Sequence, residues 1–152
     1  MNTFKFQLVT PEKVALAEEL VSLRCPTRMG EITILPHHAP LIAQLVSGEL
    51  VATDGSGVES LLHVAGGFIE IKPNNEVTAL ADSAEHFFEI DQERAQSAIQ
   101  RAQKIMAETK LSSEEYVMAA ASLERSLSRL RVARKHSHRR TAGITGQGIL
   151  EE

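Results

Sequence analysis

Apolar and polar residues alternate along the first half of the chain at the spacing of β-strands. Phe4, Phe6 and Leu8 alternate with polar residues, and Pro11 ends the run. Similar short runs, separated by turn-forming glycine, proline and asparagine, occupy residues 32–35, 50–53, 60–64, 68–72 and 77–81. Short strands at even spacing without helices between them predict a sandwich or flattened barrel of two packed antiparallel sheets.

The spacing of apolar residues changes near residue 90 to that of a helix. Asp91 stands where a carboxylate can cap a helix N-terminus, and the predicted helix ends near residue 109. Its apolar positions are Ala95, Ala98, Ile99, Ala102, Ile105 and Met106.

A second helix is predicted from Ser112, which forms a capping box with Glu115 three residues later. Its apolar residues alternate four and three apart, a heptad seam of Tyr116, Ala120, Leu123, Leu127 and Leu130. The short link predicts an antiparallel hairpin. Because its alanines bury little apolar area, we expect the hairpin to be weakly held and able to rearrange.

Charge and composition divide the chain at the same place. Of 152 residues, 43% are apolar, enough for a folded core, and the net charge is −4. Residues 1–90 carry 5 basic and 12 acidic side chains, whereas residues 91–152 carry 11 and 8. We therefore expect a β-sandwich over residues 1–87, a helical hairpin over residues 88–135 and a flexible basic, glycine-containing tail over residues 136–152.

The sequence offers little for catalysis, metal binding or membrane insertion. Cys25 is the single cysteine, so no internal disulfide is expected, and no apolar run reaches the roughly 20 residues that span a bilayer. The glycines at residues 55–57 and 66–67 lack the pattern of a nucleophile elbow or a phosphate-binding loop. We expect no enzyme activity, no metal site and a cytosolic location.

Three motifs resemble the epsilon subunit of bacterial F-type ATP synthases. Residues 30–41, GEITILPHHAPL, are similar to the family's Gly-Glu-Leu-Gly-Ile-Leu-Pro-Gly-His-Ala-Pro-Leu, with Thr33 and His37 in place of two glycines. Residues 65–71, AGGFIEI, resemble a family strand, and residues 90–95, IDQERA, resemble a nucleotide-binding signature. The resemblance runs from about Phe4 to Arg134 and implies a ten-stranded sandwich followed by a helical hairpin.

The resemblance implies a mechanical function without catalysis. Members of this family bind the gamma subunit and the ring of c subunits in the rotating central stalk, which couples proton or sodium flow to ATP synthesis. In many bacterial members the hairpin extends between the alpha and beta subunits and inhibits ATP hydrolysis. A peripheral location on the cytoplasmic face of the inner membrane is implied, with membrane association only through the complex.

The resemblance also implies site residues. The IDQERA signature suggests a regulatory ATP site, with no cofactor required, formed by Glu85, Asp91, Arg94, Ala95, Arg101, Arg125 and Arg129. Asp91 would otherwise be a simple cap and Arg94 a surface charge. Arg125 and Arg129 lie opposite the predicted seam, so they are expected to point away from Arg94 if that seam packs on the first helix.

Partner contacts are expected at two places. By resemblance, Glu31 and His38 belong to a loop at the base of the sandwich that meets the c ring and gamma; the alternative is a strand-end carboxylate and a locally bonded histidine. Seven basic and no acidic residues lie within residues 125–140, which favours an acidic partner surface. Among them we assign docking on the alpha/beta subunits to Arg131, Arg134 and Lys135.

The alternative is an adaptor that binds nucleic acid or an acidic protein through the basic second helix. Binding to a polyanion would weaken steeply with salt. The chain is acidic overall and has only six aromatic residues for stacking, so nucleic acid is not the expected partner. An exposed apolar patch on one sandwich face would favour the stalk subunit, and fully polar sheet faces would favour the adaptor.

Overall fold

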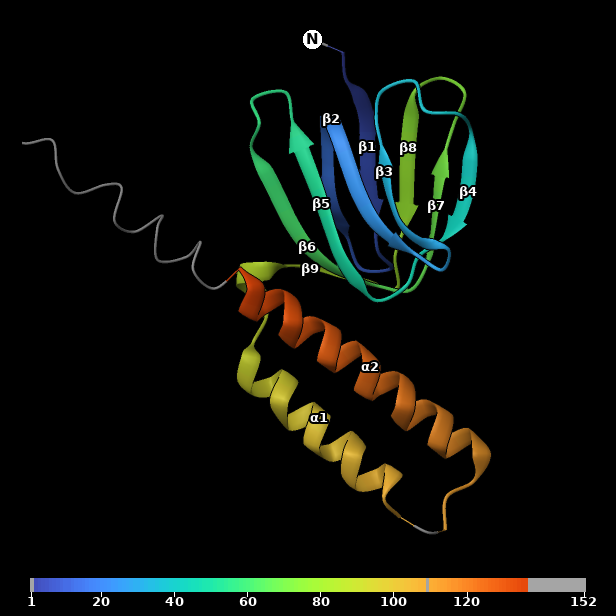
Figure 1. Ribbon diagram of the computed structural model, residues 1–152, viewed down its shortest axis with the longest axis vertical. Coiled ribbons are helices and arrows are strands. Elements are labelled where there is room, and N and C mark those ends of the chain that lie inside the picture. Colours follow the sequence, from blue (N-terminus) through green and yellow to red (C-terminus); the bar gives the residue numbers. More distant parts are fainter. Residues whose placement is uncertain (1, 109, 137–152) are drawn as a thin grey trace, which may run out of the picture. The chain divides into compact units, whose positions relative to one another are not determined.

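The computed structural model describes residues 2–108 and 110–136 (Figure 1). The chain divides into two compact units, Met1–His86 and Phe87–Glu152. In the described residues the first unit is built of nine strands and the second of two α-helices and a short 3-10 helix. The predicted fold class, a β-sandwich followed by a helical hairpin, is confirmed. The predicted tail lies outside the described residues except for His136.

The strands of the first unit form one folded sheet. Its order is β4-β7-β8-β1-β2-β5-β6-β9, with β3 paired to β2. All pairs are antiparallel except β1 with β8. The strands are β1 Phe4–Val9, β2 Val14–Thr27, β3 Gly30–Ile34, β4 Leu41–Gln44, β5 Gly48–Asp54, β6 Glu59–Ala65, β7 Phe68–Ile71, β8 Glu76–Leu80 and β9 Ser83–His86.

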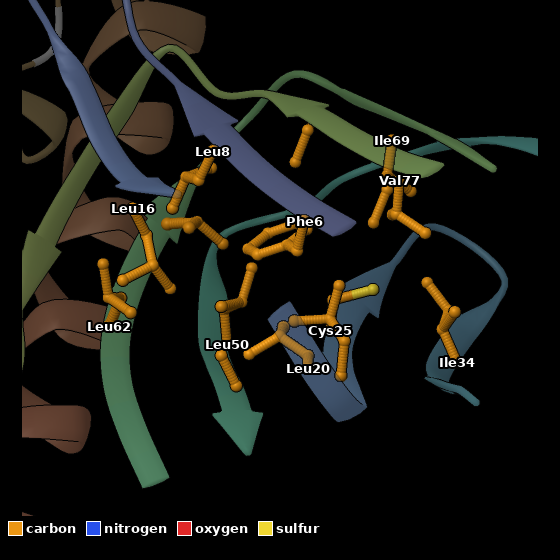
Figure 2. Packing of buried hydrophobic residues seen from close by; sticks show 14 of the residues in the cluster. Phe6, Leu8, Leu16, Leu20, Cys25, Ile34, Leu50, Leu62, Ile69 and Val77 are labelled. Atoms are coloured by element: carbon orange, nitrogen blue, oxygen red, sulfur yellow. The ribbon is translucent and has the colours of Figure 1, made fainter. Parts of the chain in front are cut away.

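The long strand β2 joins the two layers of the sandwich. Its first half pairs with β1 and its second half with β3 and β5, with a register shift between Leu20 and Ser22. The side chains that point inward from both layers meet in a single core, in which Phe6, Leu20 and Leu50 lie close together (Figure 2). Burial of this core stabilises the sandwich.

Cys25 belongs to this core. Its side chain is fully buried, and burial, aided by the negative charge of Glu31, raises the pKa of the thiol to about 12. The thiol therefore stays protonated at neutral pH and behaves as a small apolar side chain.

The Gly66-Gly67 pair of the AGGFIEI motif turns the chain between β6 and β7. Both residues have positive φ, 63° and 106°, which glycine adopts without strain. A Cβ atom at Gly67 would collide with the backbone carbonyl of Leu80 on the neighbouring strand β8. Glycine is therefore required here both for the turn and for the close approach of the two chain segments.

Helix-capping residues set the bounds of the second unit. It contains η1 Phe87–Glu89, α1 Gln92–Met106 and α2 Ser113–Lys135. The Asp91 side chain accepts a hydrogen bond from the Arg94 amide at 3.1 Å, which confirms the predicted N-cap. Ser112 and Glu115 form the predicted capping box at the start of α2. The two helices lie side by side and run antiparallel (Figure 1).

The predicted seam of α2 is wrong at two positions. Tyr116 is 48% exposed and Leu127 is 41% exposed, so neither lies at the centre of the helix contact. The buried or half-buried line is instead Ala119, Leu123, Ser126, Leu130 and Ala133. This line keeps the predicted four-three spacing but is rotated around the helix. Small side chains at every second position of the seam let the two helices approach closely.

Candidate partner-binding surfaces

An apolar stripe crosses the outer face of the sandwich. Val9 pairs with Val14 on β2 and with Leu80 on β8, and Leu80 pairs with Phe68 on β7. Directly paired residues point to the same side of a sheet, so these side chains form a row, and Ile42 continues it on β4 through Gln44, the partner of Phe68. The apolar stripe consists of Val9, Val14, Ile42, Phe68 and Leu80.

The apolar stripe is exposed. Phe68 and Leu80 are each 57% exposed, and Ile42 is 70% exposed. A groove of about 530 Å³ is lined by Phe68 and Leu80 together with the Gly66-Gly67 turn. Exposed apolar side chains gathered in one row are typical of a protein-binding surface. This is the feature that distinguishes a stalk subunit from an adaptor with fully polar sheet faces.

Charged residues occupy the other end of the same face. Lys5 on β1 lies between Glu19 on β2 and Glu76 on β8, each directly paired with it. The outer face therefore has an apolar half and a polar half. A protein that binds the apolar half would meet a charged border on one side, as is usual at protein interfaces.

The structure places Glu31 and His38 at opposite ends of β3. Glu31 lies beside the β2–β3 turn, at the lower end of the sandwich in Figure 1, and His38 lies in the β3–β4 loop at the upper end. The expectation that both belong to one loop is therefore wrong, because a strand separates them. Glu31 is itself a strand residue, and His38 follows the strand in the next loop.

Local partners hold both side chains. Arg24 lies 3.6 Å from the Glu31 carboxylate and 3.7 Å from that of Glu49. Glu31 is exposed, so its ion pair contributes little to stability. The ring of His38 is within hydrogen-bond distance, 2.8 Å, of the Ala39 carbonyl oxygen, and its backbone N–H donates to the Leu35 carbonyl. Both side chains remain accessible for a further contact.

His37 adopts a backbone conformation that glycine adopts more readily than other residues. Its φ is 62°, a left-handed conformation that is uncommon for a residue with a side chain. The His37 amide donates to the side chain of Asn75 at 2.7 Å, and its ring lies 3.1 Å from the Asn2 side-chain oxygen. Asn75 also donates to the Thr3 carbonyl. These bonds tie three chain segments together and compensate for the strained backbone.

The residues assigned to a regulatory ATP site fall in both units. Glu85 lies in β9 of the sandwich, and Ala95 is buried in the contact face of α1. Asp91 caps α1, as described above. The four arginines belong to the helical unit, where Arg94, Arg101 and Arg125 are exposed and Arg129 is half-buried.

The four arginines lie on one side of the helical unit, given the residues through which α1 and α2 contact each other. Each directly precedes a contact residue, Ala95, Ala102, Ser126 or Leu130, and so lies about 100° around its helix from that residue. When two antiparallel helices face each other, the residue just before a contact residue on one helix points to the same side of the pair as the residue just before a contact residue on the other helix. The expectation that Arg125 and Arg129 point away from Arg94 is therefore wrong, because it rested on the wrong seam.

The C-terminal half of α2 is strongly basic. The described residues 125–136 contain five basic and no acidic side chains. Arg131, Arg134 and Lys135 are all exposed, and the last two lie in the final helical turn, where positive charge complements the helix dipole. Arg139 and Arg140 of the predicted basic segment lie outside the described residues.

Sequence reasoning missed the apolar stripe. Along β7, Ile69 and Ile71 are buried while Phe68 points outward. Once the buried positions are fixed, period-two alternation identifies Phe68 as apolar on the polar side. Met29 in the β2–β3 turn, near Glu31, is a second exposed apolar side chain, with 92% of its surface accessible.

Within residues 2–108 and 110–136, no helix has the length and apolar character needed to cross a bilayer. In the same part of the chain, no three His, Cys, Asp or Glu side chains gather in a way that suits a metal ion.

Comparisons with known proteins cover both units. The family model described as "ATP synthase, Delta/Epsilon chain, beta-sandwich domain" matches residues 3–87, and the one described as "long alpha-helix domain" of the same chain matches residues 89–134. The ATP synthase epsilon chain of Dehalococcoides mccartyi is 43% identical over 135 residues, 89% of this chain and 95% of the relative. That of Syntrophobacter fumaroxidans is 40% identical over 131 residues, 86% and 96% of the two chains.

Solved structures show the same fold at lower identity. A chain of the Euglena gracilis mitochondrial ATP synthase, in a structure of its OSCP, F1 and c-ring, superposes with a TM-score of 0.75 at 20% identity, covering 84% of this chain and 79% of that one. A chain from the central stalk and c-ring of the Tetrahymena thermophila enzyme gives 0.60 at 13% identity, with coverage of 85% and 95%. From the family models and the relatives together, we conclude that the chain belongs to the epsilon chain family of ATP synthases.

Proposed function

We propose that this chain is a non-catalytic subunit of the central stalk of an F-type ATP synthase, where it binds the gamma subunit and the c ring. The exposed apolar stripe is the observation that carries this proposal, since it gives the sandwich a surface that another subunit can cover. The chain is then peripheral, held at the cytoplasmic face of a bacterial membrane by its partners. Its contribution to coupling is mechanical.

Co-purification with gamma tests this function. When the tagged chain is produced together with the gamma subunit of the same organism, we expect the two to elute as one complex that resists salt, because apolar burial is not screened. An adaptor for polyanions would instead leave gamma behind and bind an anionic matrix with an affinity that falls steeply with salt.

Two ends of the sandwich are available to the c ring. Glu31 and Met29 lie together at one end, and His38 lies at the other. We propose that the end with Glu31 faces the ring, because Met29 adds an almost fully exposed apolar side chain to the carboxylate. His38 then contacts gamma or no partner.

We also propose that the helical unit is a mobile inhibitor of ATP hydrolysis. The contact face of α1 and α2 contains many small side chains, so separation of the helices exposes little apolar area. Helix α2 spans 23 residues, about 34 Å, and ends in exposed basic side chains. An extended rod of this length and charge suits the space between alpha and beta subunits with acidic loops.

A regulatory ATP site on the helical unit is a second proposal. It is favoured by the four arginines on one side of the antiparallel pair. Arg94 and Arg125 each lie 13 residues from the inter-helix segment 107–112 and so are level with one another. Guanidinium groups from both helices can therefore share the phosphates of one nucleotide, which would hold the pair closed.

Replacing Arg94 with alanine tests this site. We expect ATP to raise the melting temperature of the helical unit in the unchanged protein and to have at most a small effect in Arg94→Ala. Loss of one charge-assisted hydrogen bond, about 1.5–3 kcal/mol, lowers affinity roughly tenfold to more than a hundredfold. Thermal unfolding followed by helix circular dichroism, with and without ATP, measures the effect.

Lys104→Ala is the matched control, since Lys104 is an exposed cation on the same helix but lies opposite the contact face. It should retain the full stabilisation by ATP. Equal stabilisation of Arg94→Ala and the unchanged protein would count against the site.

A further inference from the structure

A small apolar cluster closes the helical unit at the end opposite the inter-helix segment. Ile90, just before α1, and Val132 and Ala133, near the end of α2, are each buried to within 5% exposure. Phe87 of η1 packs against them. The chain before α1 and the end of α2 are therefore joined by side-chain packing, whereas the other ends of the helices are joined covalently.

His136 completes this cluster. It caps the C-terminus of α2, and its backbone N–H donates to the Val132 carbonyl at 3.3 Å. Its side chain is 7% exposed, and its ring meets that of Phe87 edge to face, with centroids 5.8 Å apart and planes at 63°. Such aromatic contacts contribute stability beyond the area that they bury.

Most of the large buried side chains of the helical unit lie in this cluster. Among the described residues between the cluster and the inter-helix segment, the buried residues are Ala95, Ala102, Ala119, Ser126, Ser128 and Leu130, and all of them except Leu130 are small and bury little area. The loss of one ring at the closed end therefore removes a larger share of the apolar contact than the loss of any of these small residues.

We propose that the ring of His136, seated against Phe87, is a latch that keeps α1 and α2 together. His136 lies two residues beyond residue 134, where the match to the long-helix family model ends. When the latch releases, the end of α2 leaves η1 and the two helices can separate. An effect of the latch on ATP hydrolysis rests on the proposed inhibitory function. The packing of α1 against α2 by the latch does not depend on that function.

Amide hydrogen exchange on the full-length protein tests the latch. In His136→Ala we expect amides throughout α1 and α2 to exchange about threefold to tenfold faster, the loss that corresponds to one aromatic contact. His136→Phe keeps a ring at the position and should retain the protection of the unchanged protein. Amides of β5 and β6 in the separate sandwich core serve as an internal reference and should not change.

Glu124→Ala is the matched control on α2, because Glu124 is exposed and outside the cluster. Faster exchange confined to residues 132–135 in His136→Ala would overturn the latch, since it would indicate a local cap only. Equally fast exchange in His136→Phe, or in the sandwich strands, would also overturn it. In the assembled complex, His136→Ala should strengthen inhibition; faster exchange without that change would reject the inhibitory function and leave the latch standing.

Discussion

Replacing both Phe68 and Leu80 with aspartate is expected to abolish binding of this chain to its gamma subunit. Each side chain is 57% exposed, so the sandwich itself loses little. In a covered interface, however, two carboxylates without partners would have to leave water, at a cost of several kcal/mol. A cost of about 4 kcal/mol corresponds to a thousandfold change in affinity, so we expect affinity for gamma to fall by roughly three orders of magnitude or more.

Binding to gamma in solution, by calorimetry or co-purification, measures this loss. Gln7→Asp is the matched control, because it adds a carboxylate to the same outer face of the sheet but in its polar half. The control should bind within about threefold of the unchanged protein. If the double variant binds equally well while its melting temperature is preserved, the apolar stripe is not the gamma interface.

Local sequence signals identified those elements whose bounds depend on neighbouring residues. The N-cap of Asp91 and the capping box of Ser112 each act within four residues, so the sequence alone contains the whole interaction. The hairpin between β5 and β6 is similar, because Asp54 accepts hydrogen bonds from the amides of Ser56 and Val58 within the turn itself.

Strand β2 shows where local patterns are insufficient. Its buried residues include Leu16, Leu20, Leu23 and Cys25, at spacings of four, three and two rather than a constant two. The register shift between Leu20 and Ser22 changes which side of the strand faces the core. Only the pairing partners on both sides determine where the alternation resets, and these lie far away in the sequence.

The seam of α2 and the apolar stripe illustrate a second limit. A heptad pattern predicted large residues such as Leu127 at the contact, yet Ala119 and Ala133 lie there because they allow α1, itself rich in alanine, to come close. Likewise, the exposure of Phe68 depends on which side of β7 faces the core. The contact line of α2 and the exposure of Phe68 both depend on packing between elements. The positions of the four arginines and the apolar stripe, to which functions are proposed, follow from that packing.

Ending the chain after Phe88 is expected to raise ATP hydrolysis by the assembled complex. The sandwich core lies within residues 4–84, so the shortened chain keeps every residue of that core and of the apolar stripe. It loses α1, α2 and all the basic residues of the second half. If the helical unit holds about four in five complexes in the stopped state, removing it raises the hydrolysis rate roughly fivefold.

Steady-state ATP hydrolysis by complexes assembled with either chain, at equal occupancy of this subunit, measures the gain. A full-length variant with Arg131, Arg134 and Lys135 replaced by glutamine separates the two causes of inhibition, because it keeps α2 but removes exposed positive charge. Relief of inhibition by this variant would indicate attraction to an acidic surface, and retained inhibition would indicate a steric block. Unchanged hydrolysis after truncation would reject the inhibitory function, because the helical unit would then have no influence on rotation.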